Sequence, residues 1–401
     1  MMLPSPSNLS PSSSLVKSIL FFVLAWWHVS LSTTKSEAFV LLTTTTKKRA
    51  STSRQTAEHR GRSTLQTLQV VPFIVQEDSL ELSTGVNGQV LYSFPETTSQ
   101  NQKPPLVFVH GSFHAAWCWK EHWFEYFATK GYPVLAVSLR GTGGTFAGEG
   151  IKKVKIDQHA ADLQAFLTSL QPLIDRNIIQ RSRQQETAKP VLVSHSFGGA
   201  VVMKYLERYP EEMDKLSGIA TFCSVPPSGN GPMTMRFLRR SWQQSWKITA
   251  GFAMKQSITN AALCRDLFFG GSGHDTDDDD FGVSDDDVAR YQTYFARDTE
   301  ATIDVGDFVK HLPSKNLLED GRAAFFDKLP PCLVVGATRD YIVDKEGVDE
   351  TAVYFLGPNS KPIFVDSPHD VMLGRDWKEG AKALNNWLEG GFNLAPSGGL
   401  S

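Results

Sequence analysis

The stretch VLVSHSFGGA, residues 191–200, decides the fold because a buried strand turns into a helix there at a single serine. Its first letters are mostly β-branched or apolar and predict a strand, and an apolar run resumes after the glycine pair. Ser196 stands at the junction, with the small residues Ser194 two positions before it and Gly198 two positions after it. A serine in a strand-turn-helix with the spacing G-x-S-x-G presents its hydroxyl as a nucleophile. Ser194 replaces the first glycine of that pattern, and a helix that merely begins with Ser-Gly is the structural alternative.

Short apolar runs recur along the chain, and most of them open with proline or glycine. They occupy residues 104–110, 132–139, 189–195, 217–223, 330–337 and 361–366. Such runs are typical of parallel strands that are buried on both faces. Helical patterns lie between them, as in IDQHAADLQAFLTSLQPLI and GGAVVMKYLERYP, so the chain is predicted to be an α/β protein with a mostly parallel, doubly wound sheet. Residues 71–77 and 88–94 predict two antiparallel edge strands.

Residues 226–329 interrupt this alternation and are far more than a crossover connection needs. Two stretches within them, residues 235–256 and 286–301, have a helical pattern. We therefore expect a helical lid, inserted into a core that residues 70–225 and 330–390 form together.

An acidic segment, HDTDDDDFGVSDDD at residues 274–287, lies within this insertion. A calcium-binding loop aligned on its glycine would need oxygen ligands at the fifth and twelfth positions. Phe281 and Val288 occupy those positions, so the register of a calcium loop fails. The segment is predicted to be a solvated loop.

A serine hydroxyl is unreactive until a base takes its proton. Where serine occupies such a turn, an acid and then a histidine follow it along the chain. His369, just beyond the last predicted strand, is the one histidine after the candidate acids. Asp340 is the first acid after the preceding strand and is predicted to hold and stabilise the imidazole. Asp344 and Asp366 are the alternatives.

A serine nucleophile also needs backbone N–H groups that face the developing oxyanion. One donor is expected directly after the nucleophile, at Phe197. The other is expected in the loop FVHGSFHAAWCW, where Ser112 is the first choice and Phe113 the next. His110 is predicted to brace this loop.

Five motifs together resemble the α/β-hydrolase fold superfamily over about residues 70–390. They are HGSFHAAWCW (110–119), LRGTGGT (139–145), SHSFGG (194–199), GATRDYIVD (336–344) and PHDVML (368–373). The first and third resemble the branch of plant methylesterases and hydroxynitrile lyases, and SLRGTGGT resembles bacterial esterases and lipases with a helical lid. The resemblance implies a Ser-His-Asp triad without metal or cofactor. A serine in place of aspartate excludes dehalogenase and epoxide-hydrolase chemistry.

Three functions are compatible with this resemblance. The first is hydrolysis of a carboxylic ester through an acyl-enzyme. The second is a hydroxynitrile lyase reaction, which needs a lysine near the base, and none stands beside His369. The third is a ligand receptor that turns over slowly or not at all.

Large apolar side chains of the lid indicate a hydrophobic small-molecule ester as substrate. Phe113, Trp242 and Trp246 are predicted to contact it, although such residues also bury the lid's own helices. The basic stretch with Arg236, Arg239 and Arg240 predicts either peripheral contact with a membrane surface or an ordinary solvated helix face.

The first 65 residues do not read as a domain. Residues 19–29 form an apolar segment of the length found in cleavable signal peptides, and a region rich in Ser, Thr, Lys and Arg follows it. The junction SEAFV, with Phe39, resembles the Ala-Phe junction in the two-part plastid presequences of diatoms. We expect delivery to a plastid, with a secreted protein as the alternative. Esters found there include acyl lipids and the phytyl ester of chlorophyll.

Composition excludes some classes of partner. The chain has 401 residues and a net charge of −3, which provides no bulk attraction for nucleic acid. Its four cysteines are scattered and contain no C-x-x-C pair, so neither a zinc site nor a disulfide framework is indicated. No feature of the sequence indicates an oligomeric state.

Overall fold

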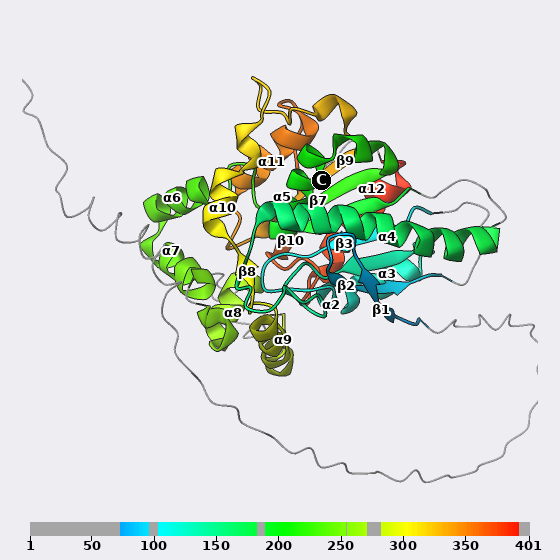
Figure 1. Ribbon diagram of the computed structural model, residues 1–401. Coiled ribbons are helices and arrows are strands. Elements are labelled where there is room, and N and C mark those ends of the chain that lie inside the picture. Colours follow the sequence, from blue (N-terminus) through cyan, green and yellow to red (C-terminus); the bar gives the residue numbers. More distant parts are fainter. Residues whose placement is uncertain (1–72, 96–102, 183–188, 254, 271–281, 393–401) are drawn as a thin grey trace, which may run out of the picture. The chain divides into compact units, whose positions relative to one another are not determined.

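The computed structural model describes residues 73–95, 103–182, 189–253, 255–270 and 282–392 (Figure 1). The predicted presequence at residues 1–65 lies outside these residues. The described residues belong to one compact unit of the chain, which begins at Phe73. None of their helices is both long enough and apolar enough to span a bilayer.

An eight-stranded sheet forms the centre of this unit, in the order β1-β2-β4-β3-β6-β7-β9-β10. The strands are β1 (Gln76–Glu81), β2 (Asn87–Ser93), β3 (Leu106–Val109), β4 (Val134–Val137), β6 (Val191–His195), β7 (Gly218–Phe222), β9 (Cys332–Arg339) and β10 (Ile363–Pro368). β2 pairs antiparallel with β1 and with β4, and every other pair in this sheet is parallel. The predicted α/β fold with a mostly parallel, doubly wound sheet is confirmed.

The first edge strand lies later in the chain than predicted. The apolar stretch 71–77 suggested it, yet β1 is formed by the polar sequence QEDSLE, which is almost entirely exposed. Its register is set by pairing with β2, from Gln76 opposite Tyr92 to Glu81 opposite Asn87. Backbone pairing at a sheet edge does not need an apolar side-chain pattern, so the sequence signal was misleading.

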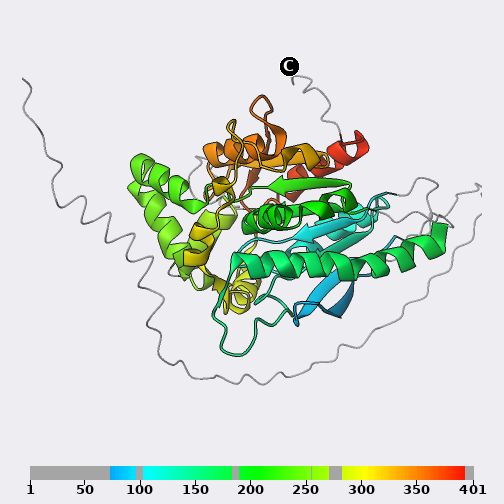
Figure 2. The same cartoon turned by 45° about the horizontal axis from the view of Figure 1, so that its top comes forward.

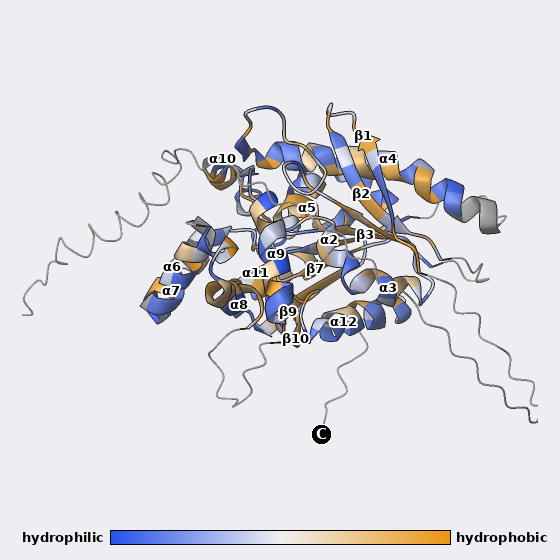
Figure 3. Cartoon of the chain, turned by 90° about the horizontal axis from the view of Figure 1, so that it is seen from below, coloured by the Kyte–Doolittle hydropathy of each residue, from blue (hydrophilic) through white to orange (hydrophobic). Residues whose placement is uncertain are grey.

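Helices cover both faces of the sheet, and each face has its own hydrophobic cluster. The first cluster includes residues of α4 (Ile156–Ser182), α5 (Phe197–Arg208) and α11 (Lys345–Leu356). The second includes residues of α2 (Trp117–Lys120), α3 (Trp123–Ala128) and α12 (Trp377–Glu389). In Figure 3 the hydrophobic colour concentrates on the central strands, whereas the surrounding helices show both colours, as helices that bury one face should.

The insertion between β7 and β9 contains α6 (Asn230–Arg240), α7 (Trp242–Ile248), α8 (Ala261–Phe268), α9 (Asp285–Arg297) and α10 (Val305–Lys310). Figures 1 and 2 show α6 to α9 gathered on one side of the sheet. The short strand β8 (Thr302–Ile303) ties the end of this insertion to β5 (Lys153–Val154). The predicted helical stretch 235–256 is broken at Ser241, which is extended and caps α7 by accepting the N–H of Gln244.

The acidic segment is not a loop throughout. Residues 271–281 lie outside the described structure, but Ser284 caps α9 and Asp285 to Asp287 form its first turn. Acidic side chains are favourable at a helix N-terminus because the helix dipole is positive there. The end of the predicted solvated loop is therefore the start of a helix.

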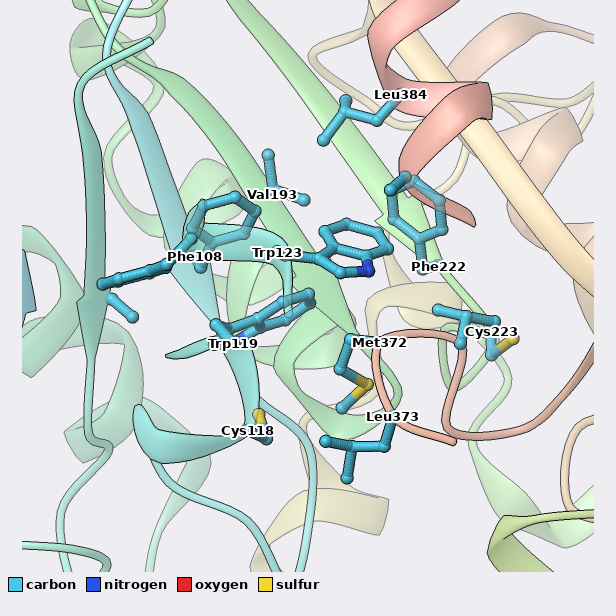
Figure 4. Packing of buried hydrophobic residues seen from close by; sticks show 14 of the residues in the cluster. Phe108, Cys118, Trp119, Trp123, Val193, Phe222, Cys223, Met372, Leu373 and Leu384 are labelled. Atoms are coloured by element: carbon cyan, nitrogen blue, oxygen red, sulfur yellow. The ribbon is translucent and has the colours of Figure 1, made fainter. Parts of the chain in front are cut away.

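Trp123 is fully buried in the second cluster. Figure 4 shows it between Phe108 and Phe222, with ring centroids 6.1 and 5.2 Å away. Trp119 stacks on the same Phe108 at 4.8 Å. These rings join α2 and α3 to the strands that carry the site described below.

Replacing Trp123 by alanine is expected to lower the free energy of unfolding by about 3–5 kcal/mol, because it leaves a cavity in this cluster. The matched control is Trp246→Ala on α7, where the side chain is 47% exposed. That variant should change stability by under about 0.5 kcal/mol. Urea denaturation followed by circular dichroism measures the free energy of unfolding of both variants. An equal loss of stability in the two variants would contradict the packing role of Trp123.

Candidate active site

Ser196 lies in a strained turn between β6 and α5. Its φ of 52° and ψ of −122° fall in a region that residues with a side chain rarely occupy. The Ser196 N–H donates to the carbonyl of Phe222 at 3.0 Å, and its own carbonyl accepts from Gly199 and Val225 at 3.0 and 3.1 Å. Bonds to β7 and α5 thus hold this conformation, as expected for a nucleophile turn.

Glycines permit the close packing around this turn. A Cβ on Gly198 would lie 2.5 Å from the carbonyl oxygen of His110, and one on Gly199 would lie 2.0 Å from Ser224 Oγ. A Cβ on Gly111 would lie 2.7 Å from the Cβ of Ser196. The His-Gly loop after β3 therefore presses against the serine, and no larger residue fits at Gly111.

Ser196, His369 and Asp340 form one chain of hydrogen bonds. His369 Nε2 is 3.1 Å from Ser196 Oγ, and His369 Nδ1 is 2.9 Å from both carboxylate oxygens of Asp340. Asp340 follows β9 and His369 follows β10, so the ends of parallel strands bring them to the serine after β6. The N–H groups of Ile342 and Val343 donate to Asp340 at 2.7 and 2.9 Å and orient its carboxylate.

The two alternative acids have other partners. Asp344 caps α11 by accepting the N–H of Gly347 at 3.1 Å, and it receives two bonds from Arg236 at 2.6 and 2.7 Å. Asp366 accepts from Arg339 at 2.9 Å and is exposed. Of the three candidates, Asp340 is the one that the structure places on His369.

Burial and charge act in opposite directions on His369. Its complete burial lowers the pKa, but the charge of Asp340, their hydrogen bond and the charge of Asp370 outweigh burial, so the pKa is raised above 6.5. Proton uptake at His369 is thereby favoured, which is what a general base requires.

The loop that is predicted to hold the oxyanion donors is braced by His110. Its Nδ1 lies 2.8 Å from the carbonyl of Gly111, and its Nε2 accepts the N–H of Leu139 at 2.9 Å. Burial lowers the pKa of His110 to about 4, so the ring is neutral at pH 7. The predicted donors lie on either side of Ser196, since Ser112 follows the tightly packed Gly111 and Phe197 opens α5. A first-turn N–H such as that of Phe197 has no acceptor within its own helix.

Two aromatic rings of the insertion lie near His369 and Phe113. Phe268 at the end of α8 lies 6.5 Å from the His369 ring and 5.9 Å from Phe113, and Phe295 of α9 lies 6.1 Å from Phe113. The sequence analysis missed Phe268 and Phe295, because nothing local distinguishes them from other apolar lid residues.

Trp242 and Trp246 were also predicted to contact the substrate. Trp246 is largely exposed, and in the described residues its ring has no contact with the rings around His369. The side chain of Trp242 lies outside the description. Arg236 and Arg240 are paired with Asp344 and Glu346, whereas Arg239 is exposed, so the structure provides partners for two of the three charges that suggested a membrane surface.

Two groups of described residues have ligand-type atoms within 4.8 Å of one another. They are His195, His369 and Asp370, and Cys223, Asp340 and His369. Both contain His369, whose ring nitrogens already bond Ser196 and Asp340. Triad hydrogen bonds account for the second group; in the first, His195 Nε2 bonds the carbonyl of His369 and Asp370 bonds His114.

Known proteins resemble the chain along most of the described residues. A model of the alpha/beta hydrolase family matches residues 106–382. Methylesterase 1 of Arabidopsis thaliana is 28% identical over 159 residues, which are 37% of this chain and 51% of that protein. Epoxide hydrolase 1 of Caenorhabditis elegans is 27% identical over 167 residues, 42% of this chain and 35% of that protein. The chain thus spans about half the length of the first of these relatives, and less of the second.

Solved structures show the same fold. Potato (Solanum tuberosum) epoxide hydrolase I superimposes with a TM-score of 0.53 at 15% identity, over 79% of this chain and 100% of that one. A bacterial membrane phospholipase A superimposes with a TM-score of 0.52 at 14% identity, over 80% of this chain and 87% of that one.

We expect the pKa of His369 to lie above 6.5 and to fall in Asp340→Asn, which removes the neighbouring negative charge. The matched control Asp344→Asn, whose carboxylate bonds Arg236 instead, should leave this pKa unchanged. NMR titration of histidine-labelled protein measures it. Because the pKa of His369 is raised in the folded protein, protonated His369 stabilises the fold at low pH. This contribution is lost as the pH rises through the pKa that His369 has in the folded protein. A pKa below 6.5 in the unsubstituted protein would contradict the prediction.

Proposed function

The chain belongs to the alpha/beta hydrolase family, and on that premise we propose that it is a serine hydrolase that cleaves carboxylic esters. The observation that carries the proposal is the unbroken chain from Ser196 Oγ through His369 to Asp340. Methylesterases and epoxide hydrolases both resemble the chain. The serine at the turn favours the esterase, because the epoxide hydrolases of this fold use an aspartate there.

The proposed reaction has two halves. In the first, Ser196 Oγ attacks the ester carbonyl while His369 Nε2 takes its proton, and the N–H groups of Ser112 and Phe197 stabilise the oxyanion. The C–O bond then breaks and the alcohol leaves with the proton from His369. In the second half, water gives a proton to His369 and attacks the acyl-serine. The bond between Ser196 Oγ and the acyl carbon then breaks, His369 returns the proton to Ser196 Oγ, and the acid is released. Asp340 holds the imidazole throughout.

The substrate of this proposal is a hydrophobic ester. Support comes from apolar side chains next to His369: the ring of Phe268 lies 6.5 Å from that of His369, and Phe113 and Phe295 pack against Phe268. A plastid lipid or the phytyl ester of chlorophyll suits these apolar surroundings. Either one also requires a plastid destination, which depends on residues outside the described structure.

The lyase alternative is less well supported. A cyanohydrin-cleaving site needs a cation beside the base to hold cyanide. The residue that follows His369 is Asp370, which is completely buried and bonded to His114. The residue before His369 is Pro368, so neither sequence neighbour of His369 supplies that cation.

Ser196→Ala is expected to lower hydrolysis of p-nitrophenyl esters by about 10³-fold or more, since it removes the nucleophile. The matched control is Ser257→Ala, a buried serine of the lid whose hydroxyl bonds only the carbonyl of Gly251 at 3.0 Å. Rates across acyl lengths from acetate to palmitate give the preferred chain length. Turnover that survives in Ser196→Ala, or is absent from the unsubstituted protein, would overturn the proposal in favour of a receptor or a lyase.

Asp340→Asn is expected to lower kcat by roughly 10³- to 10⁴-fold, because the imidazole loses its tautomer and its counter-charge. Asp344→Asn is the matched control and should retain most activity while loosening the contact between α6 and α11. Steady-state kinetics with p-nitrophenyl butyrate compares them. Equal activity in the two variants would remove Asp340 from the triad.

A further inference from the structure

A second buried carboxyl group lies next to the base without bonding to it. Asp370 directly follows His369, and its Oδ2 is 3.0 Å from Nε2 of His114. The two side chains are 0% and 1% exposed. His114 belongs to the loop after β3 that carries the predicted oxyanion donors, so this bond joins that loop to the loop of the base.

The other ring nitrogen of His114 is also bonded. Its Nδ1 lies 2.7 Å from the carbonyl oxygen of Ser112. A carbonyl only accepts, so Nδ1 carries a hydrogen. His114 therefore has a hydrogen-bond partner at each ring nitrogen, the Ser112 carbonyl at Nδ1 and Asp370 at Nε2.

Neighbouring residues of α2, α8 and α9 also restrain the pair. Trp117 stacks on His114 with centroids 5.5 Å apart, and Phe295 of α9 lies 4.9 Å away. The N–H of Asp370 donates to the carbonyl of Phe268, at the end of α8, at 3.1 Å.

His195 is a further titratable neighbour of the same carboxyl group. His195 Nε2 is 3.9 Å from Asp370 Oδ1, but it lies closer, at 2.9 Å, to the carbonyl of His369. Burial lowers the pKa of His195 well below its ordinary value, so this ring is neutral and donates to that carbonyl. His114 is therefore the partner that Asp370 serves.

We propose that Asp370 and His114 are a positioning pair that fixes the oxyanion loop relative to His369, a role that rests on the serine-hydrolase function proposed above. The carbonyl of Ser112 and the N–H of Phe113, the second-choice donor, belong to one planar peptide, so anchoring the oxygen fixes the direction of that N–H and holds the adjoining Ser112, the first-choice donor, in place. Phe113 has a φ of 69°, a conformation that needs support from its surroundings. His114 supplies that support by holding the Ser112 carbonyl, and Asp370 holds His114.

The test compares substitutions that remove the bond with one that keeps it. Asp370→Leu and His114→Phe should each lower kcat by roughly 10- to 100-fold and leave KM nearly unchanged, because the loop contributes mainly in the transition state. The double variant should lose no more than the worse single one, since both act through one bond. Asp370→Asn should retain activity within about threefold, because its amide can donate to Nε2 while Nδ1 still donates to Ser112.

A merely structural role would give a different result. Asp162 is an equally buried carboxylate, bonded twice to Arg140 at 2.7 Å, and Asp162→Asn is the matched control. It should reduce thermal stability without lowering kcat. The positioning role is overturned if Asp370→Leu keeps the kcat of the original protein. It is also overturned if kcat falls in proportion to thermal stability in all variants, Asp162→Asn included.

Labelling of Ser196 by a fluorophosphonate separates this outcome from failure of the proposed function. An original protein that neither labels at Ser196 nor hydrolyses p-nitrophenyl butyrate contradicts the hydrolase itself. An active original protein with an equally active Asp370→Leu contradicts only the positioning pair.

Discussion

The strained backbone of Ser196 is the constraint on which the rest of the site depends. A residue at this φ and ψ costs free energy of order 1–3 kcal/mol, so the surroundings must over-determine it. Three backbone hydrogen bonds hold Ser196, to Phe222 of β7, Gly199 of α5 and Val225 just after β7. Glycines also let β3, its loop and α5 approach within contact distance. The same closeness that holds the turn also brings the His-Gly loop against the serine. Strain and oxyanion geometry thus have one structural cause.

The parallel sheet explains why the site joins residues so distant in the chain. Ser196, Asp340 and His369 each follow a strand, and the carboxyl ends of β6, β9 and β10 lie at one edge. The chain then only needs short loops to bring the three side chains within hydrogen-bond distance. The lid inserted after β7 covers the same edge, which is why the end of α8 reaches His369.

Features marked by local motifs and chain order could be predicted from the sequence, whereas contacts between distant residues could not. The nucleophile turn, the base and the first-choice acid were proposed from local motifs and chain order, and the structure brings these three together. The pairing of His114 with Asp370 spans 256 positions, and neither residue has a local feature that indicates the other. Phe268 was missed and β1 was placed too early in the chain for the same reason, since only tertiary packing or backbone pairing distinguishes them.

Two carboxyl groups, Asp340 and Asp370, lie beside one histidine, yet geometry separates their roles. Asp340 meets the ring at Nδ1 and is oriented by two backbone N–H groups, so its charge acts directly on the base. Asp370 is adjacent in sequence, but its side chain bonds the ring of His114 across the sheet edge. A buried carboxyl group without a partner would be costly, and that cost makes the bond to His114 hard to break. Asp370 thereby couples the loop of the base to the loop of the oxyanion donors.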